Sequence, residues 1–187
     1  PGQWGNNITI VFIYTDIVAG TTTGMTGILT LNISASMYTV VYSPEGHFIV
    51  TLNTTAFAGV GLFSVIATIL HTNPNYANAT ETFGVSVLNR STQLGYDSPD
   101  PAPYLSFVSL YITYVDDSTG RGIAGANITV TGNGTSSLVL NTNYWVTYVG
   151  NGRYLIEVNS TALGVPGVYL LSVSVTFTGQ PFYLPGS

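Results

Sequence analysis

The sequence of 187 residues has no cysteine and no lysine, and charged residues make up only 6% of it. Without cysteine, neither a disulfide framework nor a thiolate metal site can form. Without lysine, no Lys–Asn isopeptide cross-link can staple a domain. The formal net charge of −5 argues against nucleic acid as a partner, because nucleic-acid-binding surfaces are basic. Since the charges are so few, another feature must keep the surface soluble.

Side chains suited to catalysis or metal binding are also scarce. The two histidines, His47 and His71, cannot build a His/Cys metal site without cysteine. No G-x-S-x-G nucleophile motif occurs. Asp16, Asp116 and Asp117 could contribute to a calcium site, but calcium takes about six or more oxygen ligands, so solvated loop acids are the favoured interpretation. We therefore predict no enzyme activity, no catalytic residue, no metal site and no cofactor.

Long helical patterns are absent as well. The abundance of Gly, Thr, Ser, Val and Tyr favours an all-β fold. The longest weakly polar run, 56–70, includes two Gly and one Ser and falls short of the ~20 apolar residues that a membrane-spanning helix needs. We expect this run to be a buried strand, and we predict no membrane span in the chain.

The sequence does contain an internal repeat at a constant offset of 106 residues. The stretches 38–61 and 144–167 are identical at eight of 24 positions. The identical pairs are Tyr38/Tyr144, Val40/Val146, Tyr42/Tyr148, Gly46/Gly152, Asn53/Asn159, Thr55/Thr161, Ala56/Ala162 and Gly61/Gly167. A period this long indicates two domains of one kind rather than a solenoid of short units.

Each copy of the repeat reads as a hairpin, a short connection and a further strand. In the second copy, apolar residues at 154, 156 and 158 alternate with outward residues at 155, 157 and 159, which is typical of a half-buried strand. We predict two β-sandwich domains, residues 1–88 and 106–187. The intervening residues 89–105 hold three prolines in five residues and are expected to form a stiff linker.

The closing strand of the first domain has no counterpart in the second. The first domain ends with an alternating run at 81–88, and at an offset of 106 its equivalent would begin at residue 187. We therefore predict that the second domain lacks its own last strand.

The sequence is rich in N-x-[ST] acceptor sites for N-glycosylation, and none has proline at the middle position. The eight acceptors are Asn7, Asn32, Asn53, Asn78, Asn89, Asn127, Asn133 and Asn159. Composition alone produces some of them by chance, but Asn53 and Asn159 occupy equivalent positions of the repeat. Glycans would supply the solubility that the charges do not. N-glycosylation implies an extracellular, cell-surface protein.

Two motifs connect the repeat to a known family. The pattern D-x-x-x-G…G-A-N-I-T-V at 116–130, followed by N-G-x-Y-x-x-x-V-N-x-T…G-V-Y at 151–169, resembles the Ig-like repeats of prokaryotic surface proteins, particularly archaeal ones. The resemblance covers both halves and implies two tandem Ig-like β-sandwiches. With low charge, dense acceptor sites and a missing strand, the chain also resembles glycosylated archaeal filament subunits. Such subunits can polymerise by donor-strand complementation.

We therefore predict a structural subunit of an extracellular filament, with identical subunits as partners in a homopolymer. The expected donor is the N-terminal segment of the next subunit, residues 1–14, because residues 8–14 are apolar on both faces; the donating side chains would be Ile8, Ile10, Phe12 and Tyr14. Two alternatives stay open: 182–184 could be the donor, or 180–187 could fold back and close its own domain. The alternative functions are an adhesin or sugar-binding module, and a spacer within a larger surface-layer protein or secreted enzyme.

Overall fold

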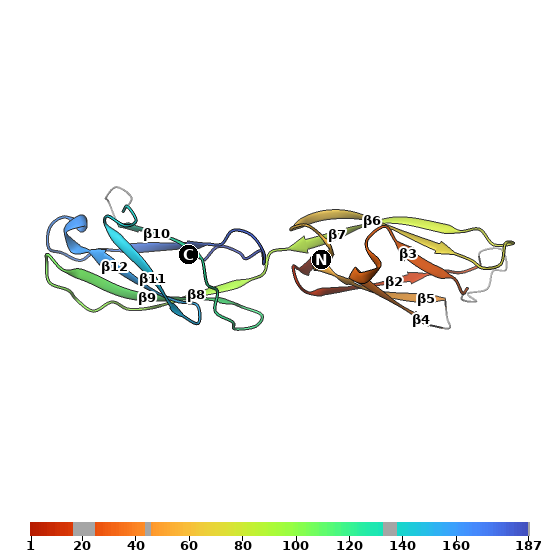
Figure 1. The fold of residues 1–187 in the computed structure, drawn as a ribbon, viewed down its shortest axis with the longest axis horizontal. Helices are drawn as coiled ribbons and strands as arrows, with labels where there is room; N and C mark the ends of the chain where they lie inside the picture. The colour runs from red at the N-terminus through yellow and green to blue at the C-terminus, as the bar shows by residue number, and fades with distance from the viewer. Residues whose placement is uncertain (17–24, 44–45, 133–137, 187) are drawn as a thin grey trace. The chain divides into compact units, whose positions relative to one another are not determined.

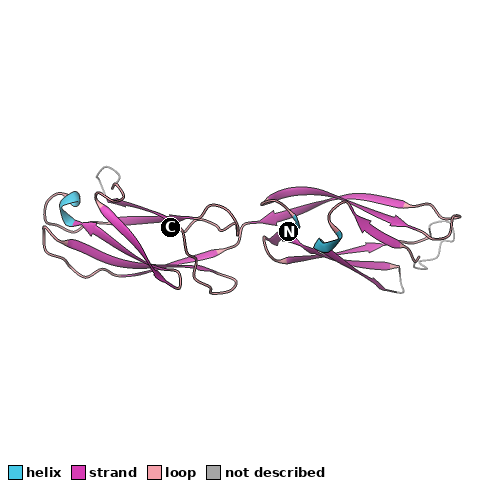
Figure 2. Cartoon of the chain, viewed as in Figure 1, coloured by secondary structure: helices cyan, strands magenta, loops and turns pink. Residues whose placement is uncertain are grey.

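The structure, a computed structural model, describes residues 1–16, 25–43, 46–132 and 138–186. All of its regular elements are β-strands apart from three short 3-10 helices, η1 (Ala35–Met37), η2 (Thr54–Ala56) and η3 (Ser160–Leu163). The strands are magenta in Figure 2, and they confirm the all-β prediction. The chain divides into two compact units, unit 1 (Pro1–Asn89) and unit 2 (Arg90–Ser187), which are coloured by residue number in Figure 1.

Unit 1 is a sandwich of two sheets. One sheet has the order β1-β7-β6-β3, with β1 (Gly2–Gln3), β7 (Ala79–Leu88), β6 (Gly61–Leu70) and β3 (Ile28–Leu31). The other has the order β2-β5-β4, with β2 (Asn7–Ile13), β5 (His47–Asn53) and β4 (Tyr38–Ser43). Alternation drives the packing: Phe48, Val50 and Leu52 of β5 are buried, and the intervening residues are not. They share one core with Val65 of β6 and Val85 of β7.

Unit 2 has its own core and a different distribution of strands. Its larger sheet has the order β11-β12-β9-β8, with β11 (Tyr144–Gly150), β12 (Arg153–Asn159), β9 (Phe107–Asp116) and β8 (Thr92–Asp97). Its smaller sheet pairs β10 (Asn127–Gly132) with β13 (Leu171–Thr176). Tyr114, Ile156 and Val158 from the larger sheet and Val130 and Val175 from the smaller one are fully buried in one cluster.

The chain order of these strands is that of tandem Ig-like sandwiches, as predicted. In both units three strands follow the B-E-D order of an Ig sheet: β2-β5-β4 in unit 1 and β9-β12-β11 in unit 2. The repeat is visible in the turns too, since Gly46 and Gly152 both adopt positive φ, 76° and 75°, a backbone conformation that favours glycine. The repeated residues therefore build the same hairpin twice.

The prediction of a linker over 89–105 is wrong for most of its length. The units divide between Asn89 and Arg90, and Thr92–Asp97 forms β8, which pairs antiparallel with β9 along six residues. The prolines at 99–103 therefore connect two strands of unit 2. The sequence hid this strand because Leu94 is its only apolar side chain that packs against the core, while Tyr96 is largely exposed.

Candidate functional site

Unit 2 contains an open apolar groove where unit 1 is filled by β7. In unit 1, β7 pairs with β6 and packs over β2, with the rings of Phe83 and Phe12 at 5.3 Å. In unit 2, the equivalent space beside β13 is a groove of about 860 Å³. Its walls include side chains from β8 and β9 on one side and from the β13 segment on the other: Leu94, Val108, Leu110, Tyr169, Leu171 and Val173.

The repeat identifies which residues of β13 lack the neighbouring strand that their counterparts have in unit 1. At the offset of 106, Val65 of β6 corresponds to Leu171 of β13, and in unit 1 Val65 lies opposite Phe83 of β7. Val65 is fully buried, whereas Leu171 is only half-buried. The described part of unit 2 contains no strand against that edge of β13. The prediction that the second domain lacks its last strand is thus confirmed in the described residues.

The C-terminal segment fills only the first position of the missing strand. Val175 exchanges two backbone hydrogen bonds with Gly186, of 2.7 and 2.9 Å. By the repeat, Val175 corresponds to Ile69, whose partner is Ala79, the first residue of β7. Because backbone groups alternate along a strand, the N–H and C=O groups of Leu171 and Val173 point to the same edge as those of Val175. No described strand pairs with them there.

The segment before β13 has lost strand structure for the same reason. β6 runs for ten residues from Gly61, but β13 runs for six and begins at Leu171. The intervening residues 167–170, equivalent to the start of β6, are not assigned to a strand, and Val168 is 99% exposed. A sequence that forms a strand in unit 1 when a partner is present therefore stays irregular in unit 2.

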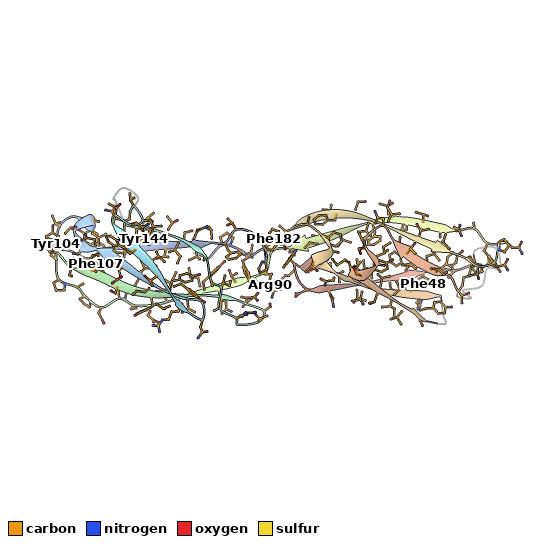
Figure 3. All side chains as sticks on the ribbon, viewed as in Figure 1. Phe48, Arg90, Tyr104, Phe107, Tyr144 and Phe182 are labelled. Carbon is orange, nitrogen blue, oxygen red and sulfur yellow. The ribbon has the colours of Figure 1, made fainter. Side chains whose placement is uncertain are left out.

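The C-terminal residues are anchored to the beginning of unit 2. The backbone of Arg90 donates to the carbonyl of Phe182 at 2.7 Å and accepts from the N–H of Leu184 at 2.9 Å; Arg90 and Phe182 are labelled in Figure 3. The hydroxyl of Tyr114 donates to the carbonyl of Leu184 at 2.6 Å. Residues 182–184 thus belong to their own domain. Of the two open alternatives, a free C-terminal donor is not what the structure shows: the segment folds back onto its own domain, but it closes the sheet only at Val175.

A buried ion pair holds this anchor. The Arg90 Nε donates to Asp116 at 2.6 Å, and Asp116 also accepts from the N–H and hydroxyl of Ser118. Burial alone raises the pKa of Asp116, but the hydrogen bonds from Arg90 and Ser118 outweigh it and bring the pKa to about 2. The same hydrogen bond raises the pKa of Arg90. Asp116 is therefore a structural carboxylate rather than a solvated loop acid.

The four predicted polymerisation residues pack within their own domain in this structure, on β2 or directly after it, rather than on a surplus strand. β2 pairs with β5 over seven residues, and Ile8, Ile10 and Phe12 pack against the unit 1 core. Tyr14 is buried and donates its hydroxyl to the carbonyl of Ala77 at 2.7 Å. The apolar outer face that suggested a donor is instead exposed, Ile13 by 64%.

The glycosylation acceptors lie where a modifying enzyme or a glycan could reach them. Among the seven that the structure describes, none is buried; Asn89 and Asn159 are half-buried, and the exposed ones are Asn7, Asn32, Asn53, Asn78 and Asn127. The predicted site at Asn133 falls outside the described residues. Exposure is compatible with glycosylation but does not test it.

The equivalence of Asn53 and Asn159 has a structural cause. Each caps a 3-10 helix: the Oδ1 of Asn53 accepts from the N–H and hydroxyl of Thr55, and that of Asn159 accepts likewise from Thr161. Asparagine is favoured at such a cap, and a threonine two residues later adds a hydroxyl that donates to the same oxygen. The repetition of these two sites therefore does not by itself favour glycosylation, a reading that the sequence alone could not provide.

The described residues include no group of three or more His, Cys, Asp or Glu that could hold a metal ion. They also include no helix of the length and hydrophobicity needed to cross a lipid bilayer.

Comparison with known proteins identifies no family for this chain. No family model matches the sequence, and no curated protein matches it. Similar solved structures include titin domains A168–A170, with 15% identity and a TM-score of 0.46 over 92% of this chain and 56% of that one. Tandem Ig repeats of Dlar have 13% identity and a TM-score of 0.32, over 99% of this chain and 89% of that one. FdeC, an Escherichia coli adhesin, has 17% identity and a TM-score of 0.34, over 99% of this chain and 58% of that one.

Proposed function

We propose that this chain is a structural subunit of an extracellular, N-glycosylated surface filament, in which a strand from a second copy completes unit 2. The observation that carries the proposal is the open edge of β13 above an apolar groove, at the place that β7 fills in unit 1. An unpaired edge with an apolar floor favours strand addition, because backbone groups and side chains gain partners together.

The donor in this proposal is the N-terminal segment, residues 1–6, of the next copy. β1 is two residues long, pairs only with the end of β7 and contributes no fully buried residue. To leave unit 1, the segment must give up the hydrogen bonds that the buried Thr54 hydroxyl donates to the carbonyls of Gln3 and Asn6. Trp4, which packs against the unit 1 core in this structure, would bring its large apolar side chain to the groove instead. Six extended residues span about 20 Å, which matches the length of β13 itself. The donor is therefore still the N-terminus, as predicted from the sequence, but its side chains are no longer the predicted Ile8, Ile10, Phe12 and Tyr14.

Such an interface would give an open polymer. The acceptor groove belongs to unit 2 and the donor to unit 1, so the two surfaces of each contact differ. Contacts between unlike surfaces extend without limit unless the rotation closes a ring. Glycans on the exposed acceptor residues would keep the poorly charged surface hydrated. The extracellular location and the homopolymer are parts of this same proposal.

The absence of cysteine allows a direct test. We propose the double variant Gln3→Cys and Ser172→Cys, which places one thiol on the donor and one on the exposed face of β13. Oxidation should give a denaturant-resistant ladder in steps of one 19.8 kDa chain. The matched control, Gln3→Cys with Thr39→Cys, has its second thiol on exposed β4 and should give no ladder.

A protein that stays monomeric at high concentration, with no ladder and no filaments by electron microscopy, would contradict the polymer. Binding of such a monomer to cells or glycans would favour the adhesin alternative. An intact mass of the native protein equal to the bare chain would contradict glycosylation separately.

A further inference from the structure

One glycosylation acceptor lies beside an exposed aromatic pair on the outer face of unit 2. Asn159, the last residue of β12, is directly opposite Phe107, the first residue of β9. The N–H of Ser160 donates to the carbonyl of Ser106 at 3.0 Å and so flanks the pair. Asn159 and Phe107 therefore form a non-hydrogen-bonded pair, in which the Cα atoms approach to about 4.5 Å and the side chains are closest.

The amide of Asn159 is held in one orientation. Its Oδ1 accepts from the N–H of Thr161 at 3.0 Å and from the Thr161 hydroxyl at 2.7 Å. These two hydrogen bonds fix the oxygen toward η3, so the amide nitrogen lies on the other side of the same planar group. That nitrogen is the atom to which an N-linked glycan attaches.

The aromatic pair packs outside the core. Phe107 is 49% exposed, and its ring meets the ring of Trp145 edge to face, with centroids 5.4 Å apart. Neither residue belongs to the core cluster of unit 2. Trp145 lies opposite Glu157 on β12, and Glu157 is two residues before Asn159 on the same face. Two large rings, a carboxylate and a glycan acceptor thus share one patch. Phe107 is labelled in Figure 3.

We infer that Phe107 and Trp145 form a docking surface for the first sugars of a glycan on Asn159. A sugar ring presents an apolar face of C–H groups, which packs favourably on the electron-rich face of an aromatic ring. The Glu157 carboxylate is an acceptor for sugar hydroxyls. The inference rests on the proposed glycosylation and adds to it that this glycan is ordered against the protein.

Unit 1 provides the contrast within the same chain. Asn53 occupies the equivalent position, but the residue opposite it is Asn7, itself an acceptor, and the counterpart of Trp145 is Thr39. A glycan on Asn53 therefore meets no aromatic ring across its strand pair. The same acceptor motif is placed on an aromatic surface in one unit and on a polar one in the other.

The test uses the full chain from a glycosylating host, with Trp4→Phe so that Trp145 is the only tryptophan. Peptide mass spectrometry first establishes whether Asn159 and Asn53 are modified. Asn159→Gln should then shift the Trp145 emission to longer wavelength, because loss of the docked sugar exposes the indole to water. Asn159→Gln should also lower the Tm of unit 2, and the decrease should be about 4 °C larger when Phe107 is present than in a Phe107→Ser background. Asn53→Gln removes an equivalent glycan and should leave Trp145 emission unchanged.

The outcomes separate the two proposals. An unmodified Asn159 defeats glycosylation at this site, and the docking inference falls with it. A modified Asn159 whose removal leaves Trp145 emission unchanged overturns the docking inference alone. An added free oligosaccharide that shifts Trp145 emission in modified wild-type protein would show that the rings are free to bind an external sugar, and would overturn it as well. Trp145→Phe, which keeps an aromatic ring, should retain the glycan-dependent difference in Tm.

Discussion

The two units use one repeated hairpin but complete their sandwiches differently. Unit 1 has β7 on its second sheet, and the free edge of β2 has no described neighbour beyond β5. Unit 2 adds β8 beside β9 on the first sheet and leaves the second sheet with only β10 and β13. The larger sheet of unit 2 is therefore complete while its smaller sheet is open. The extra strand is β7 in unit 1 and β8 in unit 2, and the two lie on different sheets. The repeated segment therefore determines the hairpin but not which strands complete the two sheets.

The comparison also shows how strand length depends on a neighbour. β6 and the β13 segment have the same inward pattern, since Val65, Ala67 and Ile69 correspond to Leu171, Val173 and Val175. Only the first has a full-length partner, and only the first is a strand from its glycine onward. Pairing, rather than local propensity, decides whether 167–170 is a strand, as expected for β-structure.

The largest effect is expected from matched charge substitutions at the equivalent positions. Val65→Asp buries a carboxylate in the filled core of unit 1 and should cost more than about 4 kcal/mol, enough to unfold that unit. Leu171→Asp places the same carboxylate at the edge of the open groove, where it reaches water. Urea unfolding followed by circular dichroism should show one lost transition for the first variant and near wild-type stability for the second.

Leu171→Asp should nevertheless prevent assembly, because a charge then lies where the donor strand packs. The matched variant Leu171→Met keeps an apolar side chain of similar volume and should assemble normally. Full polymerisation of Leu171→Asp would contradict the groove as the acceptor site. Equal loss of stability in Val65→Asp and Leu171→Asp would show that the groove is closed in solution.

The next largest effect concerns the ion pair between Arg90 and Asp116 of unit 2. Asp116→Ala leaves the mostly buried Arg90 guanidinium without its carboxylate and should destabilise unit 2 by about 3 kcal/mol. The control is Asp97→Ala, which removes the exposed ion pair to Arg153 in the same unit and should cost less than about 1 kcal/mol. Similar values for the two variants in thermal unfolding would count against the anchoring role.

The same carboxylate gives unit 2 a defined response to acid. The pKa of Asp116 is about 2 in the folded protein, below its ordinary value of 3.8. A lowered pKa contributes stability that is complete above pH 4 and is lost as the pH falls from about 4 to 2; for this group it amounts to about 2 kcal/mol. The Tm of unit 2 should therefore drop in that interval. Asp116→Asn should remove this part of the pH dependence, and an unchanged slope would show that other groups cause it.

The sequence was sufficient to predict the repeated hairpins but not the strands at the edges of the sheets. Alternation at 154–158 and the offset of 106 correctly placed the repeated strands, and the missing counterpart of 81–88 correctly indicated an incomplete sheet. β8 was missed because Leu94 is its only apolar side chain that packs against the core. β2 was mistaken for a surplus strand because its outer face is apolar although exposed. Arg90 and Asp116 meet across 26 residues, and no motif in the sequence indicated that they would pair.

The smallest effect should come from the two equivalent helix caps, Asn53 in unit 1 and Asn159 in unit 2, which allow the same substitution to be compared in both units. Asn53→Ala and Asn159→Ala each remove an oxygen that accepts two hydrogen bonds at the start of η2 or η3. In unglycosylated protein each should cost about 1 kcal/mol in its own unit, because the cap geometry is the same. Chemical denaturation of both variants measures this directly. In glycosylated protein the two should diverge, since Asn159→Ala also removes a glycan that packs on Phe107, whereas Asn53→Ala removes one that faces Asn7. Equal losses in both forms of the protein would mean that the caps, and not the sugars, account for the repetition of Asn-x-Thr in this chain.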